Sequence, residues 1–150
     1  MFRSLLALAL SVAAWASPAF AAETPLSAFD RVDIAPTRTS IYIGSISMTM
    51  PTFVRRAGTY SAAYTAKVFP YFFYNEKGTL EIDISDATLR RLERGETIDF
   101  EGRGVNSDGD KRRVTGRAAP TDATSGKIKV RVFVTKKIQL VFNTTYRFVR

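Results

Sequence analysis

Apolar and polar side chains alternate along most of the chain, and a period of two residues is typical of β-strands that bury one face. Residues 127–132 show the pattern most clearly, because Ile or Val at every second position alternates with Lys or Arg. The alternation, and the turn residues between the segments, predict about seven strands. They lie at residues 39–50, 59–74, 80–84, 97–103, 111–118, 127–134 and 137–149.

One further segment has the spacing of a short helix. Ser85 or Asp86 can cap its first turn. Leu89 and Leu92 lie three residues apart, and Gly95 ends the segment. Because strands otherwise follow one another directly, the pattern predicts an all-β fold, an antiparallel sandwich or small barrel of about seven strands with one short helix.

Three local features modify this pattern. The apolar phase switches at Gly44 and Ser45, inside the first strand, which predicts a β-bulge there. Residues 75–78 (NEKG) predict a hairpin turn in which Gly78 adopts a left-handed conformation. Residues 106–110 (NSDGD) predict another turn.

The segment 68–74 (VFPYFFY) is apolar in both phases, so both of its faces require cover. Pro70 cannot donate a hydrogen bond to a neighbouring strand, which places this strand at a sheet edge or at a bulge. Two interpretations follow. Either the aromatic side chains join the core under the short helix, or they form an exposed patch for a partner, a lipid or a glycan.

The beginning of the chain has the features of a cleavable secretory signal peptide. Arg3 supplies a positive charge, residues 5–15 form an apolar run, and residues 19–21 (AFA) form a small-x-small cleavage motif. The apolar run is short for a membrane-spanning helix. We therefore expect a secreted or periplasmic protein. Its predicted parts are a signal peptide at 1–21, an N-terminal arm at 22–38 with a short strand near 29–34, and a single β domain at 39–150.

Composition restricts the chemistry further. The sequence contains no Cys, which excludes disulfides and thiolate metal sites, and no His, the commonest general base and metal ligand. Lys and Arg number 22 against 14 Asp and Glu, a net charge of +8, and +7 once Arg3 leaves with the signal peptide (22 − 14 − 1). An excess of this size favours anionic partners or surfaces.

Basic residues gather on one phase of two neighbouring predicted strands. If these strands form a hairpin, both basic rows lie on the same outer face, because their apolar residues must share the other face. The predicted anion-binding residues are Lys111, Arg113 and Arg117 on the first strand and Lys127, Lys129 and Arg131 on the second.

The alternative is a solvated sheet face whose charges pair with one another. Asp99 and Glu101 share the outward phase of the preceding strand and can neutralise the first basic row. The row Lys127, Lys129 and Arg131 is the stronger candidate for binding, because the strand after it offers no carboxylate on that face.

No residue pattern indicates catalysis. Asp99 and Glu101 lie roughly 7 Å apart on one strand face by strand rise, whereas a glycosidase pair must flank the scissile bond. Residues 106–110 imitate the start of a calcium loop, but Arg117 stands where an EF-hand needs Glu. We therefore expect no enzymatic activity, no metal and no cofactor.

The run 108–117 (DGDKRRVTGR) and the strands after it are loosely similar to periplasmic lipid-binding β-barrels, and no residue role follows from this resemblance. The leading hypothesis is an exported, non-catalytic binding protein whose basic sheet face recognises an acidic envelope polymer or an anionic membrane surface, with no specific nucleic acid as partner. Two alternatives stay open. One is a carrier that holds a lipid or other apolar ligand inside a barrel, against Tyr60, Tyr64, Phe69 and Phe72. The other is a small outer-membrane barrel.

Export predicts a shortened chain, because signal peptidase cuts after the small-x-small motif. The intact mass of the protein recovered from outside the cytoplasm should match a start at Ala22 or Glu23. A mass that includes Met1 would refute the export prediction.

Overall fold

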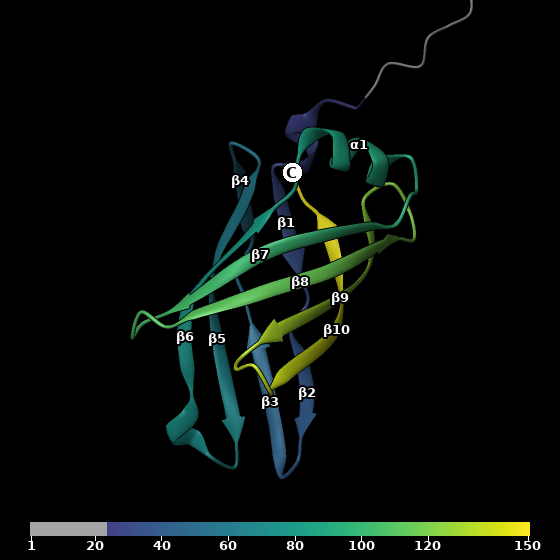
Figure 1. Ribbon diagram of the computed structural model, residues 1–150. Coiled ribbons are helices and arrows are strands. Elements are labelled where there is room, and N and C mark those ends of the chain that lie inside the picture. Colours follow the sequence, from purple (N-terminus) through teal and green to yellow (C-terminus); the bar gives the residue numbers. More distant parts are fainter. Residues whose placement is uncertain (1–23) are drawn as a thin grey trace, which may run out of the picture.

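The computed structural model describes residues 24–150, so the predicted signal peptide and its cleavage site lie outside the described residues. In this part of the chain, ten strands form one antiparallel sheet (Figure 1). They are β1 (Arg31–Ile34), β2 (Thr37–Ile41), β3 (Gly44–Thr49), β4 (Phe53–Arg56), β5 (Thr59–Phe69), β6 (Glu76–Asp83), β7 (Ile98–Asn106), β8 (Lys111–Pro120), β9 (Ser125–Phe133) and β10 (Gln139–Phe148).

The sheet closes on itself into a barrel. β5 pairs with β3 and β4 on one side and with β6 on the other, and β1 pairs with β10. β1 and β2 follow one another along β10, and β3 and β4 follow one another along β5, so each pair acts as one strand of the wall. The result is a closed antiparallel barrel of eight strands. The predicted all-β fold is confirmed, in its barrel form.

The period of two separates the inside of the barrel from its outer face. On β9, Ile128, Val130 and Val132 pack against the core, whereas Lys127 and Lys129 are exposed. The most deeply buried side chains are Ile98, Val114, Phe142 and Leu89. The outward and inward phases predicted for this strand are therefore confirmed.

Glycines on the inward phase leave room for large neighbours. A Cβ at Gly116 would lie 2.2 Å from Cζ of Phe100, the residue opposite it on β7. Five such pairs line the inside: Gly78 with Tyr64, Gly102 with Ile82, Gly104 with Leu80, Gly116 with Phe100 and Gly126 with Tyr146. Each large side chain occupies the space that a side chain on the opposite glycine would need. The wall strands can therefore pack closely around large residues.

A short helix closes one end of the barrel. The helix α1 (Asp86–Glu93) has Ser85 as its N-cap, whose Oγ accepts a hydrogen bond of 3.2 Å from the backbone N of Thr88. Its Leu89 and Leu92 are buried over the barrel end. The 3₁₀ helix η1 (Leu26–Phe29) packs beside α1 (Figure 1). No helix in residues 24–150 is long and apolar enough to cross a membrane.

Two strand predictions differ from the structure at the N-terminal side. The expected bulge at Gly44 is a hairpin turn between β2 and β3, with Ile41 opposite Gly44. The chain reverses there, so the odd positions of β2 and the even positions of β3 face the same side, which explains the phase switch. β1 agrees with the short strand expected near 29–34 within the arm, and its Val32 is buried between β10 and β4. The second difference is that residues 37 and 38, also expected in the arm, begin β2.

A third difference lies between β5 and β6. The turn expected at 75–78 falls earlier, because β6 already begins at Glu76 and Gly78 sits inside the strand opposite Tyr64. Residues 70–75 make the connection, and the Asn75 side chain closes it by accepting a hydrogen bond of 2.8 Å from the backbone N of Val68.

The barrel predicts opposite outcomes for two neighbouring substitutions. Val130→Asp places an unpaired carboxylate inside the apolar interior, which should lower the free energy of unfolding by about 2–5 kcal/mol. Lys129→Asp changes the outer face and should change it by well under about 1 kcal/mol. Denaturant unfolding of both variants measures this, and equal losses would contradict the assignment of the two faces.

Candidate functional site

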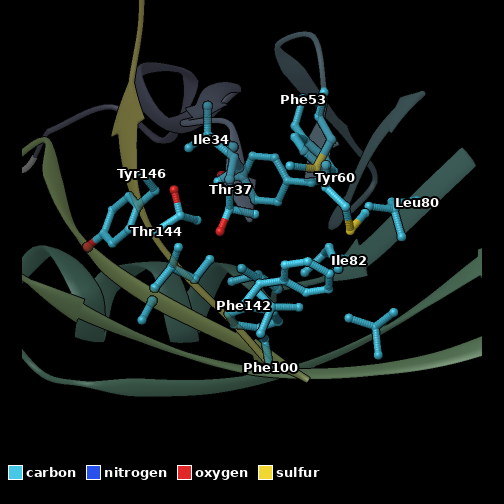
Figure 2. A pocket seen from close by; sticks show the side chains of 18 of the residues that line it. Ile34, Thr37, Phe53, Tyr60, Leu80, Ile82, Phe100, Phe142, Thr144 and Tyr146 are labelled. Carbon is cyan, nitrogen blue, oxygen red and sulfur yellow. The ribbon is translucent and has the colours of Figure 1, made fainter. Parts of the chain in front are cut away.

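The barrel interior contains an apolar hollow of about 90 Å³. Figure 2 shows Phe53 and Tyr60 on one side of it and Phe100 and Phe142 on the other. Besides tyrosines, its only polar lining residues are Thr37 and Thr144. Each of these threonines also has an apolar methyl group. A wholly apolar cavity does not hold water well and accepts an apolar guest instead.

The interior is incompletely filled. Ile82, Val130 and Val132 face inward from β6 and β9 but are only partly buried. An eight-stranded barrel is just wide enough to be filled by its own side chains or to hold one small ligand. The partly buried inward side chains and the hollow beside them agree with the second outcome.

The end of the barrel opposite α1 opens into a second, larger hollow of about 750 Å³, here called the mouth. The β2–β3 turn, the β9–β10 turn and the 3₁₀ helix η2 (Phe72–Tyr74) border it. Four side chains line both the mouth and the interior hollow and thus form the partition between them: Met48, Leu80, Val132 and Phe142. Met48 is the most adaptable of them, since methionine is unbranched and flexible.

Three polar side chains form a cluster inside the mouth. Tyr64 donates a hydrogen bond to Oε1 of Glu76, and Nη2 of Arg112 lies 3.5 Å from Oε2 of the same carboxylate. Burial, and then the bond to Glu76, raises the pKa of Tyr64. A guanidinium has five N–H donors and Glu76 engages one of them, so Arg112 retains donors for a further acceptor.

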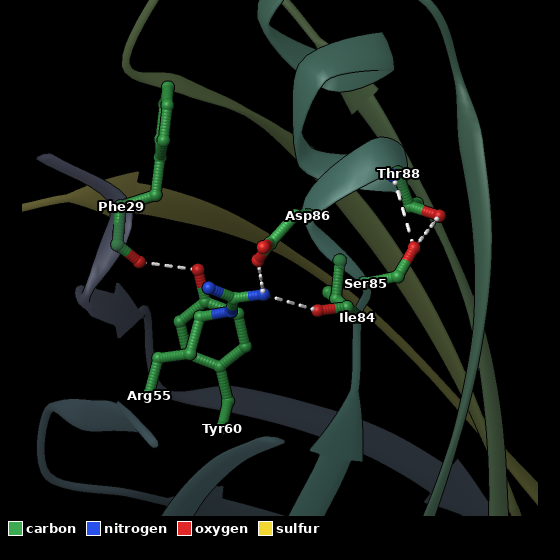
Figure 3. A network of polar contacts seen from close by, with 7 residues as sticks. All are labelled: Phe29, Arg55, Tyr60, Ile84, Ser85, Asp86 and Thr88. Atoms are coloured by element: carbon green, nitrogen blue, oxygen red, sulfur yellow. Dashed lines mark hydrogen bonds and ion pairs between the residues drawn. The ribbon is translucent and has the colours of Figure 1, made fainter. Parts of the chain in front are cut away.

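The closed end is held by a buried arginine (Figure 3). The Arg55 side chain is 8% exposed, and its Nη2 donates to the carbonyl of Ile84 at 2.9 Å and to Oδ1 of Asp86 at 2.6 Å. Its guanidinium lies over the ring of Tyr60, whose hydroxyl donates to the carbonyl of Phe29. These contacts join η1, β4, β5 and the start of α1. The Tyr60 hydroxyl is bonded to a backbone carbonyl and does not point into the hollow.

The four aromatic residues predicted to hold an apolar ligand are divided by the structure. Tyr60 and Tyr64 are buried inside the barrel, whereas Phe69 and Phe72 are exposed outside it, which corrects their expected position. At the end of β5, Val68 takes the inward position, so Phe69 points outward, and Phe72 follows the end of the strand.

The polar cluster of the mouth was missed by the sequence reasoning. Arg112 shares the inward phase of β8 with Val114 and not the outward phase of its basic neighbours. That phase is visible in the sequence and marks Arg112 as different. The sequence does not indicate its partner Glu76, because residues 75–78 predict a turn.

The first basic row lies on the outer face, and both of its arginines are paired with acids. Arg117 Nε donates to Oδ1 of Asp99 at 2.8 Å, and Arg113 lies 3.5 Å from Glu101. The hydrogen bond from Arg117 lowers the pKa of the Asp99 carboxyl. Lys111, at the start of β8, is exposed.

The second basic row is different. Lys127, Lys129 and Arg131 are exposed on β9, and none of the three forms an ion pair with any residue in the range 24–150. The register places Lys129 between Arg117 of β8 and Asn143 of β10, so both rows share one outer face.

The segment expected as a turn at 106–110 is a turn. Oδ1 of Asn106 accepts hydrogen bonds from the backbone N of Asp108 at 3.0 Å and of Asp110 at 2.8 Å. Over residues 24–150, no three acidic side chains are grouped to hold a metal ion. Asp99 and Glu101 are each engaged by an arginine on the outer face.

Comparison of the chain with protein-family models, with curated proteins and with solved structures gave no match.

Proposed function

We propose that this protein is an exported, non-catalytic binding protein that carries an elongated apolar ligand inside its barrel, with the polar end of the ligand at the mouth. The observation that carries the proposal is the apolar hollow inside the barrel, which is separated from the mouth only by the partition of four side chains. Empty space inside a core destabilises a protein by the packing that it forgoes. A guest molecule would restore that packing.

The mouth supplies the polar end of this site. Arg112 and Lys137 bring two positive charges to the mouth, and Glu76 brings one negative charge. An anionic or strongly hydrogen-bonding head group fits this balance, and the apolar lining beyond Met48 is compatible with methylene groups. The ligand class is therefore an amphiphile with one apolar tail and one acidic head, such as a fatty acid.

Filling the passage should abolish binding. Val132→Phe adds a ring where the mouth meets the interior hollow, and the affinity for a fluorescent fatty acid should fall by about tenfold or more. The control Asn143→Phe adds the same ring to the outer face of β10 and should bind as the unaltered protein does. Fluorescence titration measures both affinities, with melting temperatures as the check on folding.

Further variants and a search for retained ligand test the carrier function independently. If Val132→Phe does not fold, Ala66→Phe tests the same passage from β5, farther out in the mouth. Arg112→Gln should reduce the preference for a fatty acid over the matching fatty alcohol. The proposal is wrong if the folded, unaltered protein binds neither compound and if native mass spectrometry of protein purified from its host shows no retained ligand.

A second candidate function is recognition of an acidic envelope polymer by Lys127, Lys129 and Arg131. The supporting observation is that these three side chains lack the acidic partners that neutralise β8. Their spacing along the strand is about 6.6–7 Å, which suits a repeating polyanion. Charged outward positions on β6 to β9 also argue against the outer-membrane alternative, which needs an apolar band around the barrel.

Salt dependence tests the second candidate. Binding of lipopolysaccharide should weaken steeply from low to physiological salt, because exposed charges are screened and counterions are released on binding. Changing Lys127, Lys129 and Arg131 together to Glu should remove most of the binding, and the fold should persist because no core atom is altered. Equal affinity of the variant and the unaltered protein would exclude this function.

A further inference from the structure

Large hydrophobic side chains surround the mouth on its outer side. They belong to three separate connections, the β2–β3 turn, the β5–β6 connection and the β9–β10 turn. The hydrophobic rim, as we call it, consists of Tyr42, Ile43, Phe69, Phe72, Phe73, Tyr74 and Ile138, and every one of these is more than half exposed. In the described chain, the only other exposed large hydrophobic side chains are Val54 and Val105, and both are less than 40% exposed.

The segments that form the rim pack against one another. The β2–β3 turn packs onto the end of β5, since a Cβ at Gly44 would lie 2.0 Å from the carbonyl oxygen of Phe69. The ring of Phe73 lies 4.6 Å from that of Tyr74, measured between centroids, and the ring of Phe69 lies 6.0 Å from that of Phe72. Of the two interpretations of residues 68–74, cover by the helix is wrong, because α1 lies at the other end of the barrel (Figure 1) and the aromatic side chains are exposed.

Basic residues flank the rim. Exposed lysines at this end of the barrel are Lys67, Lys77, Lys111, Lys136 and Lys137. The exposed carboxylates at this end are Asp108 and Asp110 on the β7–β8 turn, and the side chain of Asp110 accepts a hydrogen bond from Asn106. The end that exposes aromatic rings therefore also carries an excess of positive charge.

We propose that the hydrophobic rim docks onto the surface of an anionic lipid bilayer, with the mouth facing the lipid. Phe and Tyr side chains insert at the level of the head groups, and lysines beside them attract anionic lipids. A continuous exposed apolar patch marks an interaction surface, and the charge around this one is complementary to anionic lipid. The inference goes beyond carriage of a ligand, because docking does not require that the barrel bind one.

A tryptophan introduced on the rim can report docking by its fluorescence, because the expected mature protein contains no Trp of its own. Trp15 is the only Trp in the sequence and lies in the predicted signal peptide, so a protein that starts at Ala22 contains every residue of the barrel and no Trp. Phe73→Trp places one on the rim, and Val54→Trp places one on β4, far from the mouth. With vesicles of phosphatidylglycerol and phosphatidylcholine in equal amounts, Phe73→Trp fluorescence should shift to the blue and that of Val54→Trp should stay unchanged.

Variants that remove aromatic rings of the rim or the lysines beside it are the second part of the test. Phe72→Ser with Phe73→Ser should reduce co-sedimentation with these vesicles by about tenfold or more, whereas Val54→Ser should not. Lys136→Ser with Lys137→Ser should reduce the preference over pure phosphatidylcholine vesicles. Fatty-acid binding by the rim variant should persist, which separates this inference from the carrier function. The inference is overturned if no vesicle binds the unaltered protein, or if sedimentation shows that the rim is buried between two copies of the chain.

Discussion

The constraint on which the structure depends is the closure of the sheet. β10 finds its last partner in β1, and β5 finds partners on both edges, so every wall strand is hydrogen-bonded on both sides over part of its length. Closure turns a local alternation of side chains into an inside and an outside. It also limits the interior to a fixed width, part of which is filled by large side chains that lie beside inward glycines.

The two ends of this barrel have different physical characters. At one end, Leu89 and Leu92 of α1 cover the core, and Arg55 joins β4 to the start of the helix through Asp86 and Ile84. At the other end, the β2–β3 turn and the β5–β6 connection expose hydrophobic side chains, and α1 does not reach them. A ligand or a surface can therefore approach the interior from one direction, and this asymmetry underlies both the carrier proposal and the docking proposal.

The basic residues of the outer face fall into a group that is paired with acids and a group that is not. Arg113 and Arg117 are balanced by Glu101 and Asp99, an arrangement that stabilises exposed strands modestly. Lys129 and its neighbours on β9 are not balanced, so they leave a positive strip on the wall. The same composition thus yields a neutral area and a basic area side by side, and the strand register decides which is which.

The sequence by itself determined the all-β class, the positions of most strands, the short helix with its Ser85 cap and the outward phase of Lys129, because these depend on periods of two or three to four residues. It could not show that the phase switch at Gly44 is a turn, since a bulge leaves the same trace. Only the tertiary structure decided which strands meet, and so paired Arg112 with Glu76 and left Phe72 uncovered at the mouth. Such contacts join residues far apart in sequence, and closure of the barrel brings them together.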